Sequence, residues 1–324
     1  MDESQLTPRD ADYWGAVELD ARGWVESYNA PLRIALGLRP DIEFLKMIVG
    51  TDPSKLSPFV RVTSTDAIEI CFPQGYFVWF DNAATFMNLN AAFRDRVNLC
   101  RAFEQQDHSR FFHSTWSRWL VLHEVGHVVC GHLAIRRIQT FDEFEAADTI
   151  GRLSPEQLAL RRAIEIDADV WAAQMFFVTI GSITAKNYWD GLYHTEKAAG
   201  YGMKDLAMIF LPFFMEWDHV GPEVARTHPK IYERLIVMLV YGQSAFLANA
   251  GEHGPELWNV FMLGIKEAIT YLWGLEGSML HKERPTVDLV SHWKRLTDAG
   301  VQHRRLHSFK DDWLKGTPPG LASE

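Results

Sequence analysis

The sequence predicts an α+β protein in which helices predominate. Beyond residue 90, apolar residues recur at the three- and four-residue spacing of helices that bury one face. Before that point, residues 59–63, 67–72 and 76–80 are short runs rich in β-branched and aromatic residues. These two observations predict a small antiparallel sheet followed by a helical core.

Turn residues divide the N-terminal part of the chain. Pro73 and Gly75 separate the second run from the third, which predicts a hairpin. Residues 41–49 (DIEFLKMIV) have the spacing of a short amphipathic helix. The edge of the sheet could bind an extended peptide by strand addition, although an ordinary structural hairpin would have the same sequence pattern.

The helical part of the chain contains several separate segments. Ser154 and Pro155 form a typical helix start, because Ser caps the first turn and Pro needs no backbone donor there. We therefore expect three regions: residues 1–108 with the sheet, 109–300 as the core and 301–324 as a flexible tail. The predicted helices are residues 91–106, 110–133, 141–150, 155–178, 203–217, 229–246, 256–273 and 286–299.

The composition excludes several classes of protein. Among 324 residues, 47% are hydrophobic and 23% are charged, as in ordinary soluble globular proteins. The net charge of −10 argues against a general affinity for nucleic acid or anionic membranes. Cys71, Cys100 and Cys130 form no closely spaced pair, which indicates a reducing compartment without a disulfide framework. With no signal peptide and no convincing transmembrane segment, a cytoplasmic protein is expected.

Residues 123–127 read His-Glu-Val-Gly-His, the motif H-E-x-x-H. Residues four apart lie on one face of a helix, so His123 and His127 can bind one metal ion from the same side. Glu124 lies beside the first ligand, where it can act as a general base toward water. The motif therefore predicts a zinc site with Glu124 as its catalytic residue.

The residues around this motif support the metal interpretation. Residues 119–129 are apolar apart from the motif itself, which is typical of a buried helix. Burying ionisable side chains is unfavourable unless something compensates them, and a metal ion does so. The alternative is a pair of surface histidines on an ordinary amphipathic helix. Cys130 is interpreted as a small buried hydrophobic residue rather than a ligand.

The third ligand is expected in the segment 161–173 (RRAIEIDADVWAA). Glu165 and Asp169 are four residues apart, hence on one helical face, whereas Asp167 points about 200° away from Glu165. Glu165 can complete a set of two histidines and one glutamate, and Asp169 can accept the remaining ring N–H of a ligating histidine. Asp167 and Asp142 are weaker candidates, and a solvated acidic face is the alternative.

Three segments together resemble the gluzincin metallopeptidases that include the CaaX prenyl endopeptidase, HtpX and the Oma-type proteases. HEVGHVVCGH at 123–132 resembles H-E-x-x-H-x-x-x-x-H, and EIDAD at 165–169 matches E-x-x-A-D. Thr227, His228 and Pro229, followed by Arg234, resemble T-H-P-x-x-x-x-R. A more distant likeness, carried by the first motif alone, is to the cytoplasmic phage-exclusion peptidase Lit.

This resemblance implies a zincin-like core with roles for seven residues. It implies zinc ligation by His123, His127 and Glu165, and a catalytic base at Glu124. It also implies that Asp169 supports a ligating histidine, and that His228 and Arg234 support the active site. Many of these relatives carry transmembrane helices, which this sequence lacks, so the resemblance does not imply a membrane substrate.

Two histidines can also be considered from position alone. His132 is nine residues from His123, about half a turn away on a continuous helix, so it is expected to cap or pack unless Gly131 ends the helix. His228 stands at a helix entrance, where it could stabilise an oxyanion or simply cap the helix. Tyr232, one turn further on, is a further candidate donor.

Together these features predict a soluble zinc-dependent metallopeptidase that acts on a protein or peptide, most simply as an endopeptidase. Two alternatives remain open from the sequence. One is a latent, metalloprotease-like protein used for binding or regulation. The other is a different zinc hydrolase that uses the same H-E-x-x-H motif.

Overall fold

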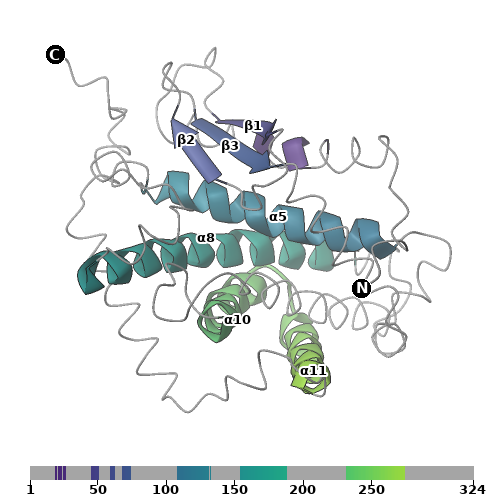
Figure 1. The fold of residues 1–324 in the computed structure, drawn as a ribbon. Helices are drawn as coiled ribbons and strands as arrows, with labels where there is room; N and C mark the ends of the chain where they lie inside the picture. Colours follow the sequence, from purple (N-terminus) through teal and green to yellow (C-terminus); the bar gives the residue numbers. More distant parts are fainter. Residues whose placement is uncertain are drawn as a thin grey trace, which may run out of the picture.

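In the computed structural model of this chain, most of the described residues are helical (Figure 1). The long helices predicted around the H-E-x-x-H motif and around the EIDAD segment are present. No helix among the described residues is long and apolar enough to cross a membrane. The structure describes residues 19, 21–23, 25–26, 45–50, 59–62, 68–73, 108–130, 132, 154–187 and 231–273.

A three-stranded sheet lies on one side of the helices. Its strands are β1 (Leu45–Gly50), β2 (Phe59–Val62) and β3 (Ile68–Pro73), in the order β1-β3-β2. β2 and β3 are antiparallel, with Val60 opposite Ile70, but β1 and β3 are parallel. The sheet is therefore mixed rather than antiparallel, and the strand predicted at 76–80 lies outside the described residues.

The helix predicted at residues 41–49 is wrong for residues 45–49, which belong to strand β1 (Leu45–Gly50). Its backbone pairs with β3 in the register that places Leu45 opposite Ile68. Parallel pairing joins segments that are distant along the chain, so a local spacing of apolar residues cannot reveal it. Intrinsic helix preference is a weak guide that such tertiary contacts override.

Four long helices follow the sheet among the described residues. The chain runs through α5 (His108–Val129), α8 (Pro155–Asn187), α10 (Ile231–Leu247) and α11 (Gly254–Trp273). They agree with the predicted segments, except that α5 ends four residues early and α8 extends nine residues further. The helices predicted at 91–106, 141–150, 203–217 and 286–299 lie outside the described residues.

The elements are stacked in layers (Figure 1). The sheet contacts α5, α5 packs along α8, and α8 packs on α10, which also contacts α11. An aromatic cluster joins the last three helices, because the ring of Phe177 on α8 lies within 5.2–6.5 Å of three rings from α10 and α11. Those rings belong to Phe246, Trp258 and Phe261.

The two helices that carry the H-E-x-x-H and EIDAD motifs meet at Gly126. A Cβ atom at this position would lie 2.9 Å from the backbone oxygen of Ala168 and 3.2 Å from the ring of Trp171. Glycine therefore allows the backbones of α5 and α8 to touch. This close approach is what brings side chains from the two motifs within reach of each other.

We expect Gly126→Ala to destabilise the protein even though alanine favours helix formation. Alanine's helix preference contributes about 1 kcal/mol, whereas overpacking against a fixed backbone typically costs about 1–3 kcal/mol. Denaturant unfolding should show a net loss of stability, and chelator competition should show weaker metal binding, because the helices must separate. Unchanged values in both measurements would show that the α5–α8 contact is not tight.

Candidate metal centre

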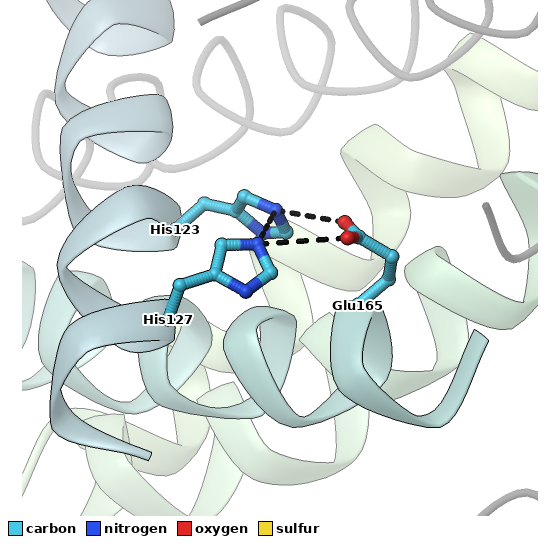
Figure 2. A group of neighbouring side chains, drawn as sticks. All are labelled: His123, His127 and Glu165. Carbon is cyan, nitrogen blue, oxygen red and sulfur yellow. Dashed lines mark hydrogen bonds and ion pairs between the residues drawn. The ribbon is translucent and has the colours of Figure 1, made fainter. Parts of the chain in front are cut away.

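Three buried side chains converge between α5 and α8 (Figure 2). His123 and His127 project from α5, and the Glu165 carboxylate meets them from α8. The His123 Nε2 atom is 3.1 Å from His127 Nε2 and 3.1 Å from Glu165 Oε2. The His127 Nε2 atom is 3.6 Å from Glu165 Oε1. One nitrogen from each ring and both carboxylate oxygens thus surround a common point.

These spacings agree with what zinc requires. Ligand bonds of about 2.0–2.1 Å in tetrahedral geometry place neighbouring donor atoms about 3.3–3.4 Å apart. The three observed separations of 3.1, 3.1 and 3.6 Å bracket that value. Two imidazoles and a carboxylate also form a donor set that zinc uses in hydrolytic enzymes, with one position left for water. The residues therefore fit a zinc ion in both chemistry and size.

Glu124 occupies the α5 position directly after His123. Its side chain is only 2% exposed, in a helix segment whose neighbours Leu122 and Val125 are fully buried. A carboxylate in such surroundings is retained only where it has polar partners or a chemical use. Its place in the chain, directly after His123, is the one that the H-E-x-x-H motif gives to a general base.

A second layer of contacts holds the His123 ring in place. The Nδ1 atom of His123 donates to Asp169 Oδ1 over 2.9 Å. On its other side, Asp169 accepts two hydrogen bonds of 2.7 Å from Arg234 on α10, one from Nε and one from Nη2. This bidentate ion pair is buried, so Arg234 and Asp169 together fix the orientation of His123.

The same contacts determine the charges at the centre. Burial by itself lowers the pKa of His123, but the carboxylates of Asp169 and Glu165 raise this pKa to about 10. Burial also works against the charged form of Asp169, yet Arg234 and His123 hold its pKa below the ordinary value. His123 is therefore protonated near neutral pH, and a metal ion that binds here must displace that proton.

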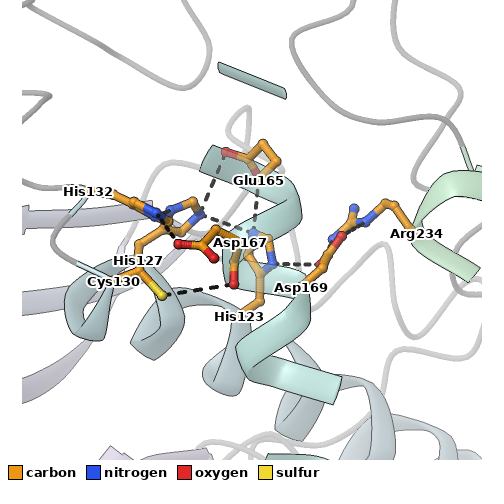
Figure 3. A network of polar contacts seen from close by, with 8 residues as sticks. All are labelled: His123, His127, Cys130, His132, Glu165, Asp167, Asp169 and Arg234. Carbon is orange, nitrogen blue, oxygen red and sulfur yellow. Dashed lines mark hydrogen bonds and ion pairs between the residues drawn. The ribbon is translucent and has the colours of Figure 1, made fainter. Parts of the chain in front are cut away.

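His127 has a different supporting partner (Figure 3). Its Nδ1 atom lies 2.9 Å from Nδ1 of His132, and both side chains are fully buried. The expectation that His132 would point half a turn away assumed a continuous helix. Because α5 ends at Val129, His132 is not on a continuation of this helix, and its ring lies against that of His127. The sequence analysis left this outcome open at Gly131, which itself lies outside the described residues.

Asp167 and Cys130 lie beside His132 in the same network (Figure 3). Asp167 is buried, and its Oδ2 atom is 3.4 Å from His132 Nε2. The Cys130 thiol is half-buried and lies 3.9 Å from the backbone oxygen of Asp167. Cys130, His132 and Asp167 offer donor atoms within 4.8 Å of one another, a grouping that the sequence analysis did not anticipate.

The remaining predicted residues fall beyond what the structure describes. His228 and Asp142 lie outside the described residues. Tyr232 belongs to α10, but the description does not extend to its side chain. The structure thus brings together His123, His127, Glu165, Asp169 and Arg234, with Glu124 adjacent to them in the chain.

A comparison with protein families adds an independent observation. Residues 113–245 match the family described as Peptidase U49. The match supports a metallopeptidase-like family of Lit-like proteases, whereas the closer resemblance to the CaaX, HtpX and Oma-type enzymes is not supported. The matched segment contains all seven residues to which the resemblance assigned roles. No curated protein and no solved structure matches the chain.

Proposed function

We propose that this protein is a zinc-dependent endopeptidase with a zincin-like core, and that it hydrolyses peptide bonds in a protein or peptide substrate. The family match supports a peptidase. The zinc, the endopeptidase activity and the residue roles are our own proposal. The observation that carries it is the convergence of His123, His127 and Glu165 at separations suited to one tetrahedral zinc ion.

Each residue then has a distinct task. Zinc, when bound, supplies a Lewis acid that polarises the scissile carbonyl and lowers the pKa of water. Glu124 accepts a proton from the attacking water and delivers it to the leaving amine. Asp169, held by Arg234, keeps the proton of His123 on Nδ1, so that its Nε2 atom can face the ion. We assign to His228 the stabilisation of the oxyanion.

The sheet offers a means of binding an extended substrate. Among the described strands, β1 and β2 flank β3, and β2 and β3 contact α5, the helix of the H-E-x-x-H motif. A peptide that added to such an edge would be held through main-chain hydrogen bonds to the strand. This mode of binding suits an endopeptidase, because it needs no pocket for a chain terminus.

A cytoplasmic location remains a prediction.

Metal analysis tests the proposal most directly. We expect one zinc per chain in the wild-type protein, and a sharp fall in zinc content in His123→Ala and Glu165→Ala, because each variant removes a donor from the convergent set. The measurement is elemental analysis of purified protein, combined with circular dichroism to establish folding. His253→Ala is a matched control, since this partly exposed histidine lies at the start of α11.

Two results would contradict the assignment. Full zinc occupancy in a folded Glu165→Ala variant would remove Glu165 from the ligand set. If the wild-type protein bound no zinc even after incubation with the metal, the proposed zinc chemistry would be wrong, although the family match to a peptidase would remain. A search for new protein N-termini in cells, comparing wild type with Glu124→Gln, would identify the substrate.

A further inference from the structure

The contact between His127 and His132 limits where their protons can be. Two Nδ1 atoms face each other at 2.9 Å, so one must carry a proton and the other must accept it. The opposite edge of His132 decides which. His132 Nε2 faces the Asp167 carboxylate at 3.4 Å, and a carboxylate can only accept, so the proton of a neutral His132 lies on Nε2. His132 Nδ1 is then the acceptor, and His127 carries its proton on Nδ1.

The rest of the chain of contacts follows from this assignment. His127 Nδ1–H donates to His132 Nδ1 over 2.9 Å. The separation of 3.4 Å between His132 Nε2 and Asp167 Oδ2 is longer than an ordinary hydrogen bond, so the negative charge of Asp167 is what favours a proton on this nitrogen. Zinc ligation requires the same arrangement, because a coordinating Nε2 cannot carry a proton.

We propose that His132 and Asp167 are positioning residues for the metal ligand His127. They hold its ring and its tautomer so that Nε2 faces the metal, in the way that Asp169 and Arg234 hold His123. This inference rests on the proposed function for its effect on metal binding, although the proton positions follow from the geometry alone. Each zinc-binding histidine of α5 is thus supported by an acidic residue of α8, directly for His123 and through His132 for His127.

A competing use of the same residues is a second metal site formed by Cys130, His132 and Asp167. Proton positions argue against occupation of both sites. A metal on His132 Nε2 would move the remaining proton of His132 to Nδ1, where it would face the proton on Nδ1 of His127. Two N–H groups opposed at 2.9 Å repel each other, so the first site would lose the support that its ligand requires.

Substitution at His132 tests the proposal through zinc affinity, measured by competition with a chelator. His132→Phe keeps a ring but cannot accept a hydrogen bond, and loss of such a supporting partner typically lowers metal affinity by about 10–100-fold. His132→Asn should recover part of the affinity, because its amide oxygen can accept the proton from His127. Asp167→Asn should show a smaller loss, since the amide oxygen can still accept but lacks the charge.

Cys130→Ala separates the two uses of this cluster. The proposed support of His127 does not require the thiol, so this variant should keep one zinc per chain at wild-type affinity. Two zinc ions in the wild-type protein, one of which is lost in both Cys130→Ala and Asp167→Asn, would overturn the proposal in favour of a second metal site. Unchanged zinc affinity in folded His132→Phe and His132→Asn would also overturn it.

Nuclear magnetic resonance of the wild-type protein, labelled with ¹⁵N in its histidines, tests the proton positions without any substitution. Long-range ¹H–¹⁵N spectra of the metal-free protein should show His127 protonated on Nδ1 and His132 on Nε2. The opposite tautomers would overturn the proposal. If the protein bound no zinc, the proposed function would fail, but these spectra would still decide whether His132 and Asp167 fix the tautomer of His127.

Discussion

The Glu124→Gln variant is expected to retain its fold and its zinc, but its rate of hydrolysis should fall by a factor of about 10²–10⁴, the usual contribution of a general base. Glutamine is nearly isosteric with glutamate and can still bind water through hydrogen bonds, but it cannot accept a proton from it. Since Glu124 is buried beside His123 rather than within the convergent donor set, the metal content should not change. Steady-state kinetics on an identified substrate, with zinc analysis of the same sample, provide the measurement.

A matched control for this variant is Glu256→Gln. Glu256 lies in the first turn of α11, and its side chain is 70% exposed, so the same chemical change there should leave the rate unaltered. Wild-type cleavage by Glu124→Gln would show that another group moves the proton. Loss of zinc together with activity would instead show that Glu124 contributes to metal binding.

The Arg234→Met variant is expected to lose about 3–5 kcal/mol of unfolding free energy, the usual effect of removing one partner from a buried ion pair. Asp169 is fully buried and accepts both of its 2.7 Å hydrogen bonds to α10 from this guanidinium. Methionine fills a similar volume but carries no charge. Among the described residues, His123 would then be the one charged partner left to the Asp169 carboxylate. Denaturant unfolding of the metal-free protein measures the change.

Two further variants assign the loss to the ion pair. Arg234→Lys keeps the charge but lacks the planar pair of donors, so its loss should be smaller than that of Arg234→Met. In the double variant Arg234→Met with Asp169→Asn, the buried negative charge is removed, and part of the stability should return. A stability of Arg234→Met within about 0.5 kcal/mol of wild type, the range of ordinary surface substitutions, would show that the pair does not stabilise the fold.

Local sequence signals predicted much of the core around the centre. The four-residue spacing of His123 and His127, and of Glu165 and Asp169, placed each pair on one helical face, and α5 and α8 have that arrangement. The start of α8 at Pro155 also follows from local chemistry, because a proline in the first turn needs no hydrogen-bond acceptor. Such features depend on neighbours within one or two turns, which a sequence displays directly.

The features that the sequence could not predict depend on contacts between distant segments. β1 is a strand because it pairs with β3, and nothing within Leu45–Gly50 specifies that partner. His132 meets His127 because α5 ends at Val129, and a helix end is the least certain part of a sequence-based prediction. Asp167 reaches His132 for the same reason, despite facing away from Glu165 on a helical wheel.

Gly126 lets the backbones of α5 and α8 touch at Ala168, so the binding of a metal ion between these helices is coupled to the folding of the chain. The donor atoms come from two helices that touch through their backbones, so the donor set is lost when unfolding separates α5 from α8. An ion bound between them therefore favours the native state alone, by an amount that grows with the logarithm of its free concentration and reaches about 4 kcal/mol at a thousandfold excess over the dissociation constant. On the proposed function, metal supply would thus control the abundance of the native chain as well as its activity.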